Sequence, residues 1–332
     1  MEAPVRILGI AMIVAFASPA LAQRGPSFEC SKASNAIERT ICKEPELATA
    51  DRELASVYAA LAGGLGAAAK DHLAKDQVRW IVGRNRDCGA EPDDMTVCLR
   101  NRYAARTTTL KAFGAGAYPF ISVQALDRKG KLGQIRFSYA IEYPQFDGAT
   151  ADFAALNARF ATDARQAAAQ ATPRAEDVAS DREQGWTYQQ GFEVHRPGPD
   201  AVTIAETYYG YNGGAHGFGG TGCTLVDLRT GRSVGPDGVF AAGDGWLSMM
   251  VQIVGDDLRK QFVEKPGFED ALEPKSLTKL LGEARHYCWK ASQLELVFNA
   301  YEVGPYAAGP YEVVISYDRL RAHFRPGGPI AR

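Results

Sequence analysis

The stretch Ile135–Tyr143, with the sequence IRFSYAIEY, decides the fold class of the chain. Its large apolar side chains alternate with polar or small ones, and this period of two predicts a strand with one buried and one solvated face. We expect the strand to pair with residues 120–126 through a turn at residues 127–130. The residues on either side of this hairpin follow different patterns.

Upstream, residues 28–113 have the period of helices. Apolar residues recur at steps of seven, four and three, and Pro45 suits the first turn of a helix, where its missing N–H is not needed. Gly63–Gly66 interrupts this pattern, a second helical segment follows, and a third begins near Cys98. We expect a small all-α hairpin or bundle, joined to the rest by the linker at residues 114–119.

Downstream, residues 119–325 mix the two periods. An Ala-rich helix begins at Thr150 with Phe153, Leu156 and Phe160 on one side. The remaining elements are expected as strands near residues 186–194, 201–209, 222–228, 293–299 and 311–317, and as helices at 244–262 and 276–284. This order predicts an α+β fold: a small disulfide-tied all-α unit followed by a larger α+β domain with a mainly antiparallel sheet.

Length and charge narrow the possibilities. At roughly 100–200 residues per domain, 332 residues predict about two domains, which we place at residues 28–113 and 119–325. The 37 Lys and Arg against 39 Asp and Glu give a net charge of −2, without the basic field that holds nucleic acid. An apolar fraction of 46% is that of a globular protein.

The first residues have the pattern of a secretory signal. The apolar run Ile7–Phe16 is followed by Ala20-Leu21-Ala22, a small-residue cleavage site, so we expect residues 1–22 to be a signal peptide. Gln23 follows the site, so a lipid-attachment cysteine is not predicted there. We expect a soluble periplasmic or secreted protein whose mature chain has no membrane span.

Export makes pairing the default for the six cysteines, because the compartments beyond the cytoplasm are oxidising. An antiparallel helical hairpin favours Cys42 with Cys88 and Cys30 with Cys98, among three possible connectivities. Cys223 is expected to pair with Cys288. The cysteines lack CxxC or zinc-ligand spacing, so we expect neither a metal nor a cofactor.

The segment that carries four of these cysteines resembles the lysozyme inhibitor LprI family domain. The resemblance rests on Phe28-Glu29-Cys30, Ile41-Cys42, Pro45-Glu46-Leu47, Cys88, Cys98-Leu99 and Tyr103. It implies an exported helical domain that inhibits lysozyme without catalytic residues. We expect Asp51, Gln77, Trp80 and Arg84 to form a polar and aromatic cluster that fixes the hairpin.

Two loops in the larger unit are rich in glycine and aromatic residues, at residues 208–222 (YYGYNGGAHGFGGTG) and 301–311 (YEVGPYAAGPY). They resemble the extracellular C-terminal domain of RsiV-type anti-sigma factors, which also accompanies a polysaccharide deacetylase domain in some cell-wall enzymes. The resemblance implies a domain that binds lysozyme. The RsiV-type signalling role does not carry over, because this sequence shows neither a transmembrane helix nor a sigma-binding segment.

These loops supply the candidate residues for binding a partner, and no catalytic residue is predicted. The candidates are Tyr211, Asn212, Gly213, Gly214, His216, Tyr301, Glu302, Gly304, Pro305 and Tyr306. His216 could be a general base, but it has no neighbouring acid at useful spacing, which favours a role in fixing the loop. The GxGxxG match at residues 217–222 precedes a strand rather than a helix, so a nucleotide site is not expected.

We therefore expect a protein that binds and inhibits lysozyme-type muramidases by steric occlusion, without catalysis. Residues 114–332 contain 22 Lys and Arg against 26 Asp and Glu, a mild acidity compatible with a basic partner. One alternative is an envelope protein that binds peptidoglycan or another glycan directly. Another is a cell-wall hydrolase or deacetylase. The two loops could also serve only to pack one end of the sheet.

Overall fold

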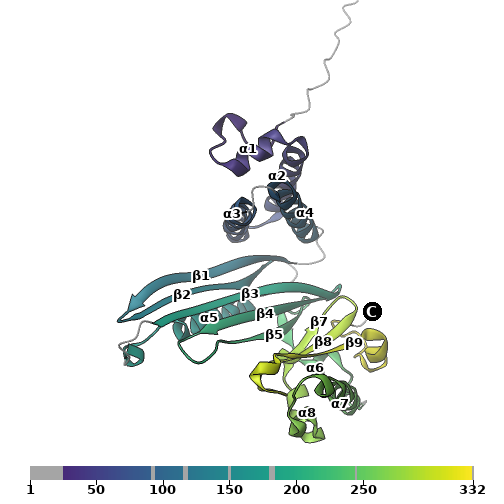
Figure 1. The fold of residues 1–332 in the computed structure, drawn as a ribbon. Helices are drawn as coiled ribbons and strands as arrows, with labels where there is room; N and C mark the ends of the chain where they lie inside the picture. The colour runs from purple at the N-terminus through teal and green to yellow at the C-terminus, as the bar shows by residue number, and fades with distance from the viewer. Residues whose placement is uncertain are drawn as a thin grey trace, which may run out of the picture. The chain divides into compact units, whose positions relative to one another are not determined.

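Helices come first in the chain and sheets follow (Figure 1). The structure is a computed structural model that describes residues 25–90, 94–114, 119–148, 151–178, 184–243 and 245–330. The predicted signal peptide lies outside these residues. Among them, no helix is both long and apolar enough to cross a membrane. The chain divides into two compact units: residues up to 56 with 84–106, and residues 57–83 with 107–332.

The helical region contains α1 (Ala36–Lys43), α2 (Pro45–Gly64), α3 (Ala67–Gly89) and α4 (Met95–Gly114). Asn35 caps α1, its side-chain oxygen accepting a hydrogen bond from the backbone N–H of Glu38 at 2.9 Å. As predicted, α2 begins at Pro45, and the glycine-rich segment at residues 63–66 contains both the end of α2 and the break before α3. The predicted helical character of this region is confirmed.

The predicted disulfide connectivity in this region is wrong. Cys30 pairs with Cys42 instead of Cys98, and Cys88 pairs with Cys98 instead of Cys42. Cys30 lies in a 3₁₀ turn just before α1, whereas Cys42 lies near the end of α1. Cys88 lies near the end of α3, and Cys98 lies in the first turn of α4. Each cysteine thus has a partner only 12 or 10 residues away, and such short loops close at low entropic cost.

A buried polar group joins the helices of the first unit. The Tyr103 hydroxyl donates to Asp51 Oδ1 at 2.7 Å and accepts from Arg84 Nη1 at 2.7 Å. Burial raises the pKa of Tyr103, so the hydroxyl keeps its proton. Asp51 also accepts a hydrogen bond from the Ser27 backbone at 2.6 Å. Asp51 and Arg84 therefore belong to a structural cluster, as predicted, with Tyr103 between them.

The larger unit contains a six-stranded sheet in the order β1-β2-β3-β4-β5-β6. Its strands are β1 (Phe120–Leu132), β2 (Ile135–Asp147), β3 (Gln184–Gly198), β4 (Ala201–Tyr211), β5 (Phe218–Asp227) and β6 (Arg232–Val234). Neighbours are antiparallel except β2 and β3, which are parallel. The β1–β2 pairing is confirmed, but the turn lies at residues 133–134, where Gly133 has a φ of 56°, and not at 127–130.

Helix α5 (Ala154–Gln170) joins β2 to the parallel strand β3 and lies against the sheet (Figure 1). The predicted apolar side of α5, Phe153, Leu156 and Phe160, is buried. Further along, Ala164 and Ala168 pack on Ile141 of β2. These small side chains let the helix approach the strands closely.

A second sheet has the order β7-β8-β9, with β7 at Tyr287–Trp289, β8 at Gln293–Phe298 and β9 at Tyr311–Ser316. The helices around it are α6 (Pro236–Val239), α7 (Trp246–Glu264), α8 (Pro274–Leu281) and α9 (Tyr317–Leu320). Its inward side chains meet one face of α7, formed by Trp246, Met250, Val254 and Leu258, in the main apolar core. The predicted α+β fold with a mainly antiparallel sheet is confirmed.

One disulfide joins the two sheets. Cys223 of β5 is bonded to Cys288 of β7, which confirms the predicted pair. Ala205 of β4 and Val297 of β8 pack around the bridge, and all four side chains are buried. The bridge fixes the start of the second sheet against the middle of β5.

The Tyr103 cluster yields a prediction about stability. Replacing Tyr103 by Phe removes the hydroxyl that links Asp51 to Arg84 and leaves buried polar groups with fewer partners. We expect Tyr103→Phe to lower the free energy of unfolding by about 1–3 kcal/mol, measured by urea unfolding followed by circular dichroism. Tyr58→Phe, at a half-buried position of α2, is the control. An unchanged unfolding midpoint for Tyr103→Phe would contradict this account.

Candidate partner-binding site

The structure brings the two glycine-rich loops together. The first loop connects β4 to β5, and the second connects β8 to β9. The His216 ring stacks on Tyr306, with ring centroids 3.9 Å apart and 19° between the planes. The Tyr301 hydroxyl lies 3.3 Å from Nε2 of His216, and its ring centroid is 6.0 Å from that of Tyr306. We call His216, Tyr301 and Tyr306 the aromatic loop cluster.

Asn299 attaches the second loop to β5. Its side-chain oxygen accepts from the Thr221 N–H at 2.8 Å, and its Nδ2 donates to the Thr221 carbonyl at 3.0 Å. This pair of bonds satisfies both backbone groups of one residue, as a neighbouring strand would. A Cβ atom at Gly220 would lie 2.8 Å from Asn299 Oδ1, so this position requires glycine for the close approach.

Glu302 fixes the second loop from within. One carboxylate oxygen accepts from the Asn299 N–H at 2.7 Å, and the other pairs with Arg285, which also pairs with Glu283 at 2.7 Å. The Glu302 side chain is only 16% exposed. Glu302 is also one of the predicted partner contacts, and in this structure both of its carboxylate oxygens have partners within the protein. The neighbouring His286 donates through Nδ1 to the Val297 carbonyl, and burial lowers its pKa, which favours the neutral ring.

Tyr301 has an unusual backbone conformation. Its φ of 72° is the only positive value at a non-glycine among the described residues. A side chain in this left-handed region costs about 1–2 kcal/mol. The Tyr301 N–H donates to the Gly304 carbonyl at 2.8 Å, which closes the turn, and the side chain is 59% exposed. Strain of this kind concentrates at functional sites, and here it presents an aromatic ring to solvent.

The other predicted residues have different surroundings. Tyr211 and Asn212 line a small recess together with Trp186 and Phe218 and do not belong to the aromatic loop cluster. Gly213, with a φ of 88°, and Gly214 form the exposed tip of the first loop. Gly304 is buried, and a Cβ there would lie 2.6 Å from the Tyr311 ring. Pro305 precedes the 3₁₀ turn η6 (Tyr306–Ala308) that carries Tyr306.

Sequence reasoning missed two kinds of residue. Asn299 and Arg285 position the second loop, but both precede the aromatic motif and carry no local signal. Tyr209 and Phe218 are 52% and 42% exposed and lie opposite Gly219 and Gly210 in the β4–β5 register. The alternation of aromatic residues and glycines in these two strands is the signal that could have indicated them, because an aromatic ring covers a cross-strand glycine.

The ring of His216 makes local hydrogen bonds. Nδ1 lies 2.7 Å from the Gly217 carbonyl, which can only accept, so Nδ1 donates. Nε2 lies 3.3 Å from the Tyr301 hydroxyl. Both ring nitrogens thus have partners within the loops. This geometry favours the structural role over that of a general base.

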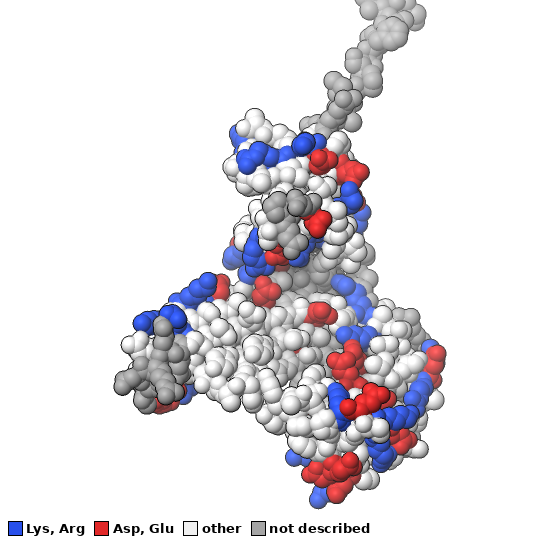
Figure 2. Space-filling model, viewed as in Figure 1, with Lys and Arg blue, Asp and Glu red and all other residues white. Residues whose placement is uncertain are grey.

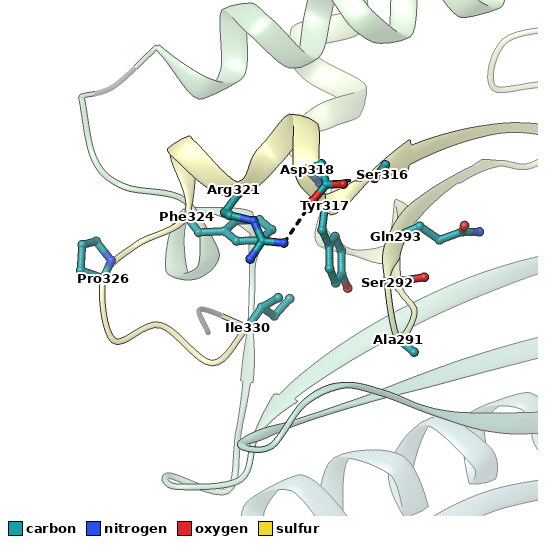
Figure 3. A pocket seen from close by; sticks show the side chains of 10 residues that line it. All are labelled: Ala291, Ser292, Gln293, Ser316, Tyr317, Asp318, Arg321, Phe324, Pro326 and Ile330. Atoms are coloured by element: carbon teal, nitrogen blue, oxygen red, sulfur yellow. Dashed lines mark hydrogen bonds and ion pairs between the residues drawn. The ribbon is translucent and has the colours of Figure 1, made fainter.

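A separate cavity of about 420 Å³ lies at the start of β8 and the end of β9, at the far end of these strands from the loop that joins them (Figure 3). Tyr317, Arg321 and Phe324 line it. Arg321 pairs with Asp318 at 3.1 Å, and the Tyr317 hydroxyl donates to the Lys290 carbonyl at 2.6 Å. These polar groups have partners within the protein, so the aromatic loop cluster is the stronger candidate. Over the described residues, no group of three or more His, Cys, Asp or Glu side chains could hold a metal ion.

Comparison with known families divides the chain into three segments. Residues 30–110 match the family model described as "Lysozyme inhibitor LprI". Residues 134–219 match "Deacetylase PdaC", and residues 238–318 match "Protein of unknown function (DUF3298)". The resemblance to LprI is therefore confirmed. The three matches are compatible with an RsiV-type domain but do not name one, so that resemblance stays a prediction.

Two crystal structures are similar to this chain. One is a member of the DUF3298 family from Bacteroides fragilis, with 16% identity, a TM-score of 0.45, and coverage of 64% of this chain and 96% of that one. The other is a DUF3298 family protein from Pseudomonas aeruginosa, with 18% identity, a TM-score of 0.44, and coverage of 65% and 99%. The search of curated proteins finds no match.

The backbone of Tyr301 gives a prediction that a matched pair of variants can test. Tyr301→Gly and Tyr301→Ala lose the same ring contacts, but only glycine adopts a φ of 72° without steric cost. We expect the glycine variant to be about 1 kcal/mol more stable than the alanine variant in urea unfolding. Equal stability, or a less stable glycine variant, would show that this residue is not strained.

Proposed function

We propose that this protein is exported after cleavage of residues 1–22 and that it binds and inhibits lysozyme-type muramidases. The match of residues 30–110 to a lysozyme inhibitor family carries the proposal. All six cysteines are paired, which supports an oxidising compartment, the periplasm or the exterior of the cell. We further propose two binding modules, at residues 28–113 and 119–325.

The aromatic loop cluster is the proposed contact surface of the larger module. Rigid aromatic side chains make effective anchors, because little conformational entropy is lost when they bind. Tyr301 is exposed, and its hydroxyl lies within hydrogen-bond distance of His216, which in turn stacks on Tyr306. In the proposed complex, the aromatic loop cluster covers the cleft of the muramidase and blocks it sterically. The RsiV-type resemblance, which implies a lysozyme-binding domain, supports this assignment.

Charge has a secondary part in the proposed contact. On the face visible in Figure 2, side chains of both signs lie close together around α7 and α8, and the long strands present mostly uncharged residues. A field of a single sign would have favoured attraction of a charged partner over long range. The mixed pattern instead favours recognition through aromatic contacts at short range.

The loop surface can be tested with a variant that keeps its fold. Purified mature chain is titrated into a lysozyme turbidity assay, with calorimetry in parallel. We expect inhibition by the natural chain and at least about tenfold weaker binding for Tyr301→Gly, because loss of an aromatic anchor costs upwards of 1 kcal/mol. Val314→Ala is the matched control, since Val314 is 51% exposed on the adjoining strand β9. It should inhibit as the natural chain does.

Three outcomes would contradict parts of the proposal. The absence of both heat and inhibition with every lysozyme class at micromolar protein would overturn the function. Full inhibition by Tyr301→Gly would overturn the loop surface and leave the helical module as the inhibitor. Release of acetate or muropeptides by the protein alone would overturn the non-catalytic role. That last outcome would favour an enzyme, a second candidate that the match to "Deacetylase PdaC" at residues 134–219 keeps open.

A further inference from the structure

An open cavity of about 350 Å³ lies between α5 and the strands of the six-stranded sheet. From the sheet it is lined by Tyr188 and Gln190 of β3, Glu206 and Tyr208 of β4, and Gly222 of β5. We call this set of residues, with the α5 side chains that face them, the α5 groove. Its volume lies at the lower end of the range for small-ligand sites, roughly 300–1,000 Å³.

The strand register explains how the groove arises. Side chains alternate between the two faces of a strand, so Tyr188 and Gln190 share a face, as do Glu206 and Tyr208. Gln190 lies opposite Tyr208 in the β3–β4 pairing, and Glu206 lies opposite Gly222 in the β4–β5 pairing. From the helix, the residues that face these strands are one helical turn apart: Asp163, Gln166, Ala167 and Gln170.

Glycine keeps the floor of the groove open. A Cβ atom built at Gly222 would meet no heavy atom within 4 Å, and this residue has an ordinary extended backbone. The space above Gly222 is therefore a cavity and not a close backbone approach. At the other end, Gln170 and Tyr188 also line the recess that contains Trp186, which extends the groove along the sheet.

The polar groups of the groove form a chain that ends in a carboxyl group. The Tyr188 hydroxyl donates to Gln190 Oε1 at 3.1 Å, and Gln190 Nε2 donates to Glu206 Oε1 at 3.3 Å. Burial raises the pKa of Glu206 to about 7, with a further contribution from the charge of Asp163 and an opposing one from Arg159. Near neutral pH this carboxyl is therefore present in both forms, one that only accepts hydrogen bonds and one that also donates.

Aromatic rings line the same space. The rings of Tyr188 and Tyr208 are stacked, with centroids 6.2 Å apart and planes 20° from parallel. The side chains that line the cavity include no Lys or Arg within the described residues. On the helix, Gln166 and Gln170 are exposed, and their side-chain amides make no hydrogen bond to another described residue, so both amides are available to a ligand. The groove therefore combines apolar faces with planar polar groups.

We propose that the α5 groove binds an uncharged carbohydrate chain. A sugar ring has an apolar C–H face that packs on an aromatic ring, and hydroxyl groups at its edge that both donate and accept. Tyr188 and Tyr208 supply the apolar surface, while the side-chain amides offer a donor and an acceptor in one plane. Asp163 and Glu206 line the groove and disfavour an anionic ligand, although Arg159 lies near enough to Glu206 to lower its pKa.

This inference goes beyond the proposed function, because the groove and the aromatic loop cluster share no residue. A glycan site would hold the protein on the polymer that muramidases cleave. The two proposals can fail separately. Lysozyme inhibition tests the loops, and binding of a free oligosaccharide, measured without lysozyme, tests the groove.

The experiment uses calorimetry with the mature chain and the tetramer of N-acetylglucosamine. We expect saturable binding, and at least tenfold weaker binding for Gly222→Val, which fills the cavity. Valine suits an extended strand, so the variant should fold, as circular dichroism would verify. Gly191→Val is the matched control: Gly191 of β3 lies on the opposite face from Gln190, and a Cβ atom there also meets open space. It should bind the tetramer as the natural chain does.

Calorimetry with the tetramer in the absence of lysozyme measures this site separately from the loop surface. The absence of heat with the tetramer at millimolar concentration would overturn the proposal. Equal binding by folded Gly222→Val would also overturn it, because the sugar would then lie elsewhere. Preferential binding of the deacetylated, cationic glucosamine tetramer would contradict an uncharged ligand and point to the two carboxyl groups as the recognition element.

Discussion

The candidate site depends on the attachment of one sheet to the other along β5. The Cys223–Cys288 bridge joins two strands 65 residues apart in the sequence, and two residues before Cys223 the side chain of Asn299 binds both backbone groups of Thr221. Together these links fix the loop between β8 and β9 over the start of β5. His216, in the loop just before β5, therefore meets Tyr306.

The glycines in and next to these loops allow close packing and do not serve as flexible hinges. At Gly220 and Gly304 a Cβ atom would collide with Asn299 and with the Tyr311 ring. At Gly210 it would collide with the ring of Phe218. These glycines allow side chains to pack directly on the backbone. The strained backbone of Tyr301 is compatible with such a packed loop, because the surrounding contacts determine its conformation.

Local pattern was sufficient to predict most elements of the fold. The alternation in Ile135–Tyr143 identified β2, and the helical period together with Pro45 and Gly63–Gly66 gave the limits of α2. The disulfide pairs at the start of the chain could not be derived this way. The Cys30–Cys42 pair depends on how the segment before α1 folds back, and the Cys88–Cys98 pair depends on how the start of α4 lies beside the end of α3. Helix length determines neither.

The sites are harder to predict than the elements, because they combine distant residues. The two loop motifs were identified as a pair, but the contact between His216 and Tyr306 spans 90 residues and depends on the bridge between the sheets. Glu302 carries no local sign that its carboxylate faces inward. The α5 groove is not marked by one motif, since its side chains come from one helix and three strands and meet only through the strand register. Tyr208 and Gly222 are the members that also belong to the first loop motif.

The central claim is that both loops contact a muramidase together, as one surface. Hydrogen–deuterium exchange of the mature chain, with and without a lysozyme that it inhibits, tests this directly. The account predicts that lysozyme slows exchange at residues 211–217 and at residues 299–310 at the same time. Slowed exchange confined to residues 30–110, or at one loop without the other, would contradict it.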